Sequence, residues 1–194
     1  METALATGID HLSAYALTVE SGTEYARRIR AGTAVAPDDD VQAARMEQVD
    51  DLAASAGLAR YELSNWARPG AESRHNRTYW RGGDWLGVGA GAHGHWRGRR
   101  WWCVRSPERY VERAVAGRST TAGEEVPTPD ERRTERLLMG LRLVEGVARR
   151  AVEPLDEAAV EQLVAGGLLH ADRERIALTS AGMRLASAVT VRLL

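Results

Sequence analysis

Cysteine is almost absent from this sequence, which has Cys103 alone among its 194 residues. A disulfide needs two cysteines, and a zinc finger or a thiolate-held iron–sulfur cluster needs three or four. The chain can therefore build none of these from its own cysteines. It also lacks an apolar run near the ~20 residues of a membrane span, and its start, METALATGID, lacks the basic and apolar regions of a secretory signal. We expect a cytoplasmic protein.

Lysine and phenylalanine are missing as well, so arginine supplies all 26 basic residues. We interpret this as the bias of a GC-rich genome, which weakens arginine as a sign of nucleic-acid binding. Residues 60–118 hold twelve arginines against five acidic residues, but the net charge of the whole chain is −1 and that of 124–194 is −2. An acidic C-terminal part makes poor phosphate contacts, so we do not expect nucleic acid as a partner.

The N-terminal part has the pattern of an α/β fold. Residues 9–17 and 58–64 are short and largely apolar, as strands of a parallel sheet are. Between them, the acidic residues 38–40 suit a helix N-terminus, and spaced apolar residues predict a helix over about 40–56. This order of strand, helix and strand predicts one unit of a parallel sheet.

The middle part is rich in tryptophan and glycine. We expect a long loop over 65–83, because no periodic pattern covers it, and long loops in compact domains are often functional. A glycine-rich strand or turn is expected over 84–94, and a hairpin over 95–104 that turns at Gly98. A helix capped by serine is then expected over 106–117.

A second domain is expected to begin at residue 124, because the polar stretch 118–128 contains glycine and proline. We therefore divide the chain into domains 1–123 and 124–194. The second domain is predicted to be small, helical and winged-helix-like. Its expected elements are helices over 129–145 and 155–165, short strands over 167–171 and 175–178, and a last helix from Thr179 to Leu194.

The segment from His75 to Trp80 holds the densest group of chemically useful side chains. A neutral imidazole is a good axial ligand for haem iron, and Tyr79 and Trp80 offer flat surfaces for a macrocycle. Nearby arginines can pair with propionate carboxylates; they are Arg74, Arg77 and Arg81. The alternative is a loop whose aromatic side chains only hold it against the rest of the fold.

Three further features have a structural and a functional interpretation. His93 and His95 lie two residues apart and form either a metal-binding pair or a structural pair, and the absence of a third ligand favours the second. Gly87–Gly94 lacks the following helix and acidic residue of a dinucleotide site, so close packing near a planar ligand fits better. Cys103 is expected to fill apolar space.

Three segments of the sequence resemble the HemW-type haem chaperones, radical SAM proteins similar to oxygen-independent coproporphyrinogen III oxidase. They are HLSAYALTVESGT at 11–23, YELSNWARPGAESRHNRTYWRGGDWLGVGAGAHG at 61–94 and LLMGLRLVEG at 137–146. The resemblance implies that residues 1–123 are the C-terminal part of a partial (β/α) radical SAM barrel. It also implies that a helical, winged-helix-like domain follows.

The resemblance also implies site residues. The haem-associated motif of the family, HN-x-x-YW, stands complete at His75, Asn76, Tyr79 and Trp80, with His75 as the candidate ligand of the haem iron. Tyr15 and Thr18 match a strand that touches S-adenosylmethionine in the related oxidase. The C-x3-C-x2-C motif that holds a [4Fe–4S] cluster is absent, as is roughly the first half of a family member. No catalytic residue is therefore assigned, and an enzyme is not expected from this chain alone.

Two functions follow from the resemblance. The first is a haem-binding chaperone that delivers haem to an acceptor protein, including one at the membrane. The second is a radical SAM oxidoreductase of porphyrin biosynthesis whose cluster-binding N-terminal half is supplied elsewhere. Under either function, a dimer is a further expectation. A third interpretation is that the chain is a remnant of a longer protein and has no independent activity.

Overall fold

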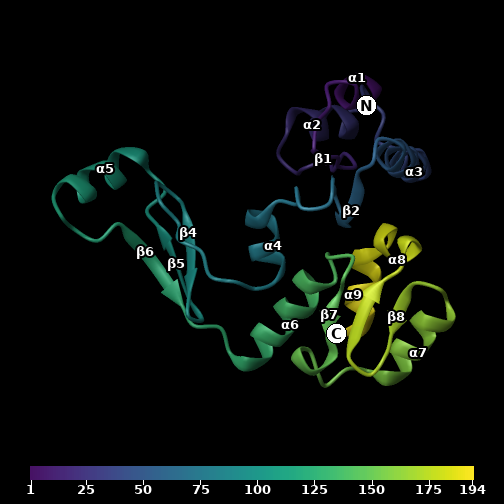
Figure 1. The fold of residues 1–194 in the computed structure, drawn as a ribbon. Coiled ribbons are helices and arrows are strands. Elements are labelled where there is room, and N and C mark those ends of the chain that lie inside the picture. The colour runs from purple at the N-terminus through teal and green to yellow at the C-terminus, as the bar shows by residue number, and fades with distance from the viewer. The chain divides into compact units, whose positions relative to one another are not determined.

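The computed structural model describes residues 1–194, which divide into two compact units, Met1–Glu72 and Ser73–Leu194. Both units mix helices and strands, which confirms the expected α/β class (Figure 1). The expected boundary between residues 123 and 124 lies within strand β6 and stays a prediction. No helix has both the length and the apolar character that a membrane crossing requires.

The first unit has three helices and one small sheet. Helix α3 begins where the acidic start predicts it, because the Asp38 side chain accepts a hydrogen bond of 2.9 Å from the Val41 amide. It ends before Gly57, whose positive φ of 76° closes the helix. The elements of this unit are α1 (Glu2–Leu5), β1 (His11–Ser13), α2 (Glu24–Arg30), α3 (Asp39–Ser55), β2 (Ala59–Glu62) and β3 (Asn65–Ala67).

The sheet of the first unit corrects the expected parallel pairing. Strand β3 lies between β1 and β2 and pairs with both in antiparallel fashion. Residues 65–67, expected in a loop, are therefore its central strand. Their placement follows from Trp66, which is fully buried and packs with Leu58 and Ala53 in the core of this unit.

The second unit contains two antiparallel three-stranded sheets, β4-β5-β6 and β7-β9-β8 (Figure 1). The hairpin between β4 and β5 turns at Arg97 and Gly98, both with positive φ, as predicted. The elements up to the second sheet are α4 (Arg74–Trp80), β4 (His93–Trp96), β5 (Arg99–Cys103), α5 (Pro107–Val115), β6 (Thr121–Glu125) and α6 (Pro129–Gly140). The rest are β7 (Val147–Ala148), the 3-10 turn η1 (Arg149–Ala151), α7 (Glu157–Ala165), β8 (Leu169–Ala171), β9 (Arg175–Leu178), α8 (Ser180–Arg184) and α9 (Ala186–Leu193).

Three expected elements of this unit were wrong in part. Helix α4 replaces part of the expected loop over 65–83, because Ser73 caps it through a hydrogen bond from the Asn76 amide. Helix α6 ends at Gly140 rather than 145, where a Cβ would overlap the Val147 side chain of β7. The last helix divides into α8 and α9 at Leu185, whose φ of −113° is not helical.

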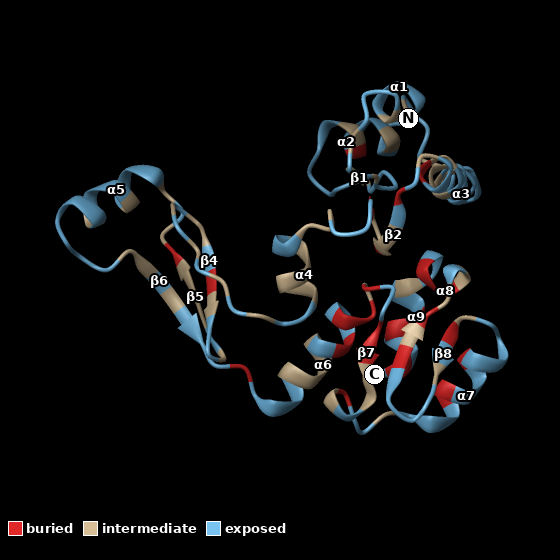
Figure 2. Ribbon diagram, viewed as in Figure 1, coloured by how far each residue is buried: buried red, intermediate tan, exposed pale blue.

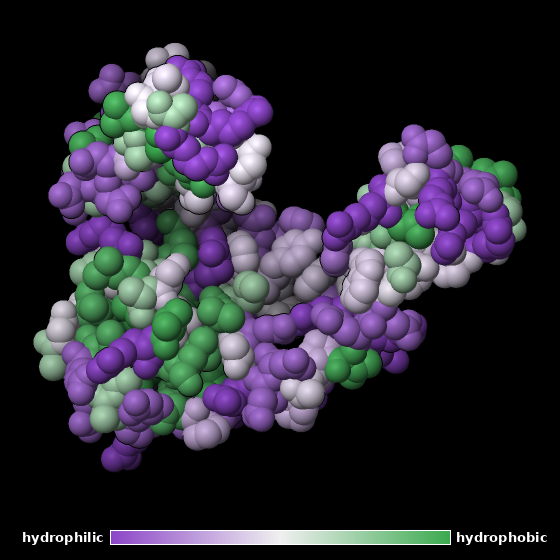
Figure 3. Space-filling view, turned by 180° about the vertical axis from the view of Figure 1, so that it is seen from behind, coloured by the Kyte–Doolittle hydropathy of each residue, from purple (hydrophilic) through white to green (hydrophobic).

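Helices α6 to α9 and the sheet β7-β9-β8 share the main core of the second unit (Figure 2). The arrangement of helices around a small sheet agrees with the expected winged-helix-like part. Hydrophobic side chains also gather on the surface over these C-terminal helices (Figure 3, lower left), where Leu185, Val191 and Leu194 are exposed. The buried apolar residues include Leu137, Leu141, Leu143, Val147, Val152, Val160, Leu169, Ile176, Leu178 and Val189.

Candidate functional site: an aromatic cavity between α4, β4-β5-β6 and α6

Helix α4 carries all four residues of the haem-associated motif. His75 and Tyr79 are one helical turn apart, and their rings meet edge to face with centroids 4.8 Å apart. Asn76 and Trp80 have the same spacing on the neighbouring side of the helix. His75 is exposed, whereas the other three are partly buried. The helix therefore presents Tyr79 and Trp80 to the protein and His75 to solvent.

Two arginines anchor α4 to the loop after α6. Arg77 and Arg81 each place an Nη2 atom 2.7 Å from a carboxylate oxygen of Glu145. Burial acts to raise the pKa of Glu145, but the hydrogen bonds and charges of Arg81 and Arg77 outweigh it and lower the pKa below its ordinary value. These two arginines thus already hold a protein carboxylate, which corrects the expectation that they pair with propionates.

Trp80 is held by a second cation. The guanidinium of Arg142 lies 4.1 Å from the centre of the Trp80 ring, within the range of a cation–π interaction. Trp80 Nε1 is buried and has no hydrogen-bond partner within the protein. An unpartnered buried donor has a desolvation cost, which this N–H carries in the folded protein.

A row of aromatic rings continues from α4 to the sheet. The Tyr79 and Trp85 ring centroids are 4.6 Å apart, and those of Trp85 and His95 are 5.0 Å apart. On the same sheet, His93 stacks on Trp102 at 6.1 Å. These contacts make one row of rings from the helix to β4 and a second pair of rings on β4 and β5, and both line the same cavity.

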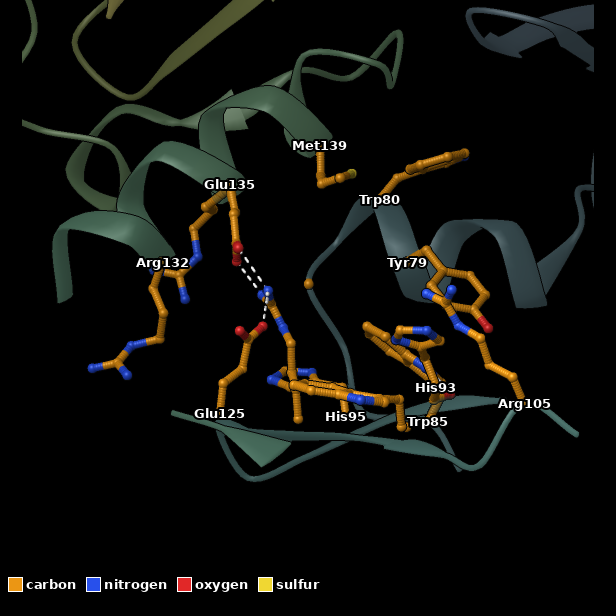
Figure 4. Close-up of a pocket in the computed structure, with 15 residues that line it drawn as sticks. Tyr79, Trp80, Trp85, His93, His95, Arg105, Glu125, Arg132, Glu135 and Met139 are labelled. Carbon is orange, nitrogen blue, oxygen red and sulfur yellow. Dashed lines mark hydrogen bonds and ion pairs between the residues drawn. The ribbon is translucent and has the colours of Figure 1, made fainter. Parts of the chain in front are cut away.

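The aromatic surface lines a cavity of about 660 Å³, which Figure 4 shows with α4, the sheet and α6 around it. This volume lies within the range of pockets that hold cofactor-sized ligands, roughly 300–1,000 Å³. Tyr79, Trp80 and Met139 contribute from the two helices. The further lining residues are Gly82, Trp85, His93, Gly94, His95, Arg100, Trp102, Arg105, Glu125, Arg132, Glu135 and Arg136.

The sheet face toward the cavity follows from strand alternation. His93 pairs in register with Trp102, and His95 pairs with Arg100, so these four side chains share one face of β4 and β5. Arg100 donates hydrogen bonds to both carboxylate oxygens of Glu135 on α6, and these bonds raise the pKa of the guanidinium further. The pair joins the floor of the cavity to its helical wall.

The structure brings together part of the predicted site and adds to it. Tyr79 and Trp80 line the cavity, while His75 and Asn76 do not. The sequence reasoning weighed His93 and His95 as a metal-binding or a structural pair and favoured the second, and it overlooked Trp85 and Met139. Alternation along 93–102 was the signal that could have found the sheet residues, because it places both histidines on the face of Arg100 and Trp102.

The residues matched to S-adenosylmethionine lie in the first unit. Tyr15 and Thr18 follow β1, which ends at Ser13 instead of continuing to residue 17, and both are exposed. Tyr15 has 69% of its surface accessible. Cys103 is buried and free, as expected of an apolar filler. A single buried thiol does not fit a cluster that needs three cysteine ligands.

Comparison with known proteins identifies a family. The HemN C-terminal domain family matches residues 128–185. The heme chaperone HemW of Mycobacterium tuberculosis strain H37Rv is 45% identical over 194 residues, which are 100% of this chain and 50% of that protein. HemW of Bacillus subtilis strain 168 is 30% identical over 97% of this chain and 52% of its own length.

A solved structure has the same fold. Coproporphyrinogen III oxidase (HemN) from Escherichia coli, a radical SAM enzyme, superposes with a TM-score of 0.71 over 98% of this chain and 49% of its own, at 15% identity. The chain spans about half the length of the curated relatives it matches. The match at 45% identity over the whole of this chain shows that it belongs to the HemW family.

Proposed function

We propose that this chain binds haem in the cavity between α4, the sheet β4-β5-β6 and α6, and passes it to an acceptor protein. The observation that carries the proposal is the aromatic lining, in which Tyr79 and Trp80 of the haem-associated motif continue into Trp85 and Trp102. The relatives named heme chaperone support the same reading. S-adenosylmethionine binding at Tyr15 and Thr18 stays a prediction from the resemblance.

The shape and chemistry of the cavity fit a porphyrin. A porphyrin is a large, flat and mostly apolar ring, so it gains by covering indole and phenol faces. Tyr79 and Trp80 offer such faces from the helix, and Trp102 offers one from the sheet. The volume of about 660 Å³ and the opening to solvent also suit a molecule that must leave again.

Two arginines at the cavity can meet the propionates. Arg105 and Arg136 line it, are exposed, and make no ion pair within the protein. Guanidinium groups without a partner are suited to carboxylates of a ligand. In this proposal Arg105 and Arg136 bind the propionates. The sequence reasoning gave that role to Arg77 and Arg81, but both of these pair with Glu145.

The motif makes His75 the candidate iron ligand. Its ring touches Tyr79, which lines the cavity, but His75 itself is exposed outside the lining. It would therefore meet an iron at the rim. Replacing His75 with alanine should change the Soret band of the haem-loaded protein, and an unchanged spectrum and affinity would remove His75 as a ligand.

Titration of the full chain with haem tests the binding proposal. We expect a saturable Soret band for the wild type and a loss of affinity of at least about tenfold, or 1.4 kcal/mol, in the double variant Tyr79→Ala/Trp80→Ala. Trp96→Ala is the matched control, because Trp96 is an exposed aromatic on β4 that does not line the cavity. Equal affinity in all three proteins would contradict haem binding at this cavity.

Transfer is tested with a haem-free globin as the receiving protein. The loaded chain should lose its Soret band as the globin gains one. If the haem passes within a complex of the two proteins, dilution should slow both changes, whereas prior release of haem into solution would give a rate independent of the globin concentration. A chain that binds haem but never releases it would be a store and not a chaperone.

A further inference from the structure

His95 occupies a protected position on the floor of the cavity. It lies on β4, with 14% of its side chain exposed, and its ring contacts that of Trp85 at 5.0 Å (Figure 4). The backbone groups of His95 and Trp85 exchange two hydrogen bonds of 2.7 and 2.9 Å. The position and the ring plane of His95 are thus fixed by the strand and by an aromatic neighbour.

The hydrogen bond of the His95 ring determines which nitrogen is free. Nδ1 lies 3.0 Å from the carbonyl oxygen of Gly83, and a carbonyl can only accept, so Nδ1 carries the hydrogen and donates it. The Asp84 carboxylate lies 3.7 Å from the same nitrogen and favours the same tautomer. In the neutral ring Nε2 then keeps its lone pair, and it makes no hydrogen bond within the protein.

This arrangement is the one that metal-binding histidines use. Such a histidine donates its second ring N–H to a carbonyl or carboxylate, which orients the ring and increases the basicity of the ligating nitrogen. The other two candidate imidazoles lack it. His93 lines the cavity and stacks on Trp102, but its ring has no hydrogen bond, and His75 is exposed outside the lining.

We propose that Nε2 of His95 binds the iron of haem held inside the cavity. The inference rests on the proposed haem-binding function and assigns an iron ligand that the motif does not contain. Gly83 and Asp84 act as positioning residues, because they hold the imidazole without touching the iron.

Two substitutions at one position separate the ligand role from the structural role. His95→Asn keeps an N–H donor where Nδ1 stands, so the bond to Gly83 can persist, but it removes Nε2. His95→Ala removes both. His93→Ala is the comparison for the spectrum alone: it removes an imidazole from the same strand, face and cavity, so it also costs lining surface and affinity, but it should leave the Soret maximum at the wild-type position. Thermal unfolding of the haem-free variants shows whether each is folded.

We expect both His95 variants to shift the Soret maximum and to bind haem at least about tenfold more weakly, while His95→Asn unfolds at the wild-type temperature. Added imidazole should restore the wild-type Soret maximum in His95→Ala by supplying the lost ligand, which a purely structural histidine would not allow. A wild-type spectrum and affinity in His95→Asn would overturn the ligand. Absence of haem binding by the wild type would overturn the proposed function itself, and the ligand with it.

Discussion

The guanidinium of Arg142 and the indole of Trp80 stack at 4.1 Å, joining the residue after the C-cap of α6 to the last residue of α4. Both side chains are partly buried, so water screens their attraction less than at an open surface. Trp80 belongs to the haem-associated motif and lines the cavity. The contact therefore determines how this indole is presented to a ligand.

A double-mutant cycle measures this contact. We expect Arg142→Ala and Trp80→Leu to show a coupling free energy of about 1 kcal/mol in urea unfolding, the usual strength of a partly desolvated cation–π pair. The cycle is needed because Arg142 has other interactions that the single substitution also removes. A coupling of zero would mean that Trp80 is held by packing alone.

Glu145 should make the anchoring of α4 depend on pH. Because Arg81 and Arg77 lower its pKa in the folded state, its stabilising effect is present above the ordinary pKa of 4.5 and is lost as the pH falls through the lower folded value. Glu145→Gln should therefore unfold more easily than the wild type at pH 7, by at most about 1 kcal/mol since the carboxylate is partly exposed. The difference should shrink as the pH falls through the lowered pKa of the folded state.

The matched control for that pH series is Glu161→Gln, which removes an exposed carboxylate of α7 that makes no ion pair. Its unfolding free energy should follow that of the wild type at every pH. Equal losses in the two variants would show that net charge, and not the contacts of Arg77 and Arg81, determines the effect.

Local signals predicted the elements whose ends carry a side-chain cap or a turn glycine. The acidic helix start at 38–40, the turn at Gly98 and the helix start at Thr179 are where the sequence places them, and Asp38 and Thr179 cap the two helices. Pairing between strands was not predictable in the same way. Residues 65–67 are too few to show a period, and only burial of Trp66 against residues distant in sequence makes them the central strand of a sheet.

The site shows the same division between local and distant information. Tyr79 and Trp80 were predicted from the motif, and both line the cavity. Arg77 was predicted to face a ligand, but it holds Glu145, 68 positions away along the chain. The tautomer of the His95 ring was likewise not predictable from the sequence. It is fixed by a hydrogen bond that Nδ1 donates to the carbonyl of Gly83, in the loop before the sheet.

The Arg100–Glu135 pair should set the spacing between the cavity floor and α6. Both side chains are mostly buried, and the two parallel hydrogen bonds between them are charge-assisted. Glu135→Gln should lower the unfolding free energy by roughly 1–2 kcal/mol and weaken haem binding, because Arg100 loses one of the two oxygens that accept from it and the negative charge that pairs with it. Arg99→Gln is the control, since Arg99 pairs with Glu124 in an exposed position. Equal haem affinity in both variants would contradict a role for the pair in the cavity.

A substitution at Gly123 can shift the Trp102 indole on the floor of the cavity without removing a side chain. A Cβ at Gly123 would overlap the indole of Trp102, its partner in the strand register, and this rigid ring can only shift away. Gly94→Ala is the matched control: Gly94 borders the cavity only with its backbone, and its Cβ would overlap Trp101, which lies on the other face of the same sheet and does not line the cavity. Overpacking should destabilise both variants by about 1–3 kcal/mol, but only Gly123→Ala should also weaken haem binding in a Soret titration. Equal affinity losses would mean that binding follows the general stability of the sheet and not the position of Trp102.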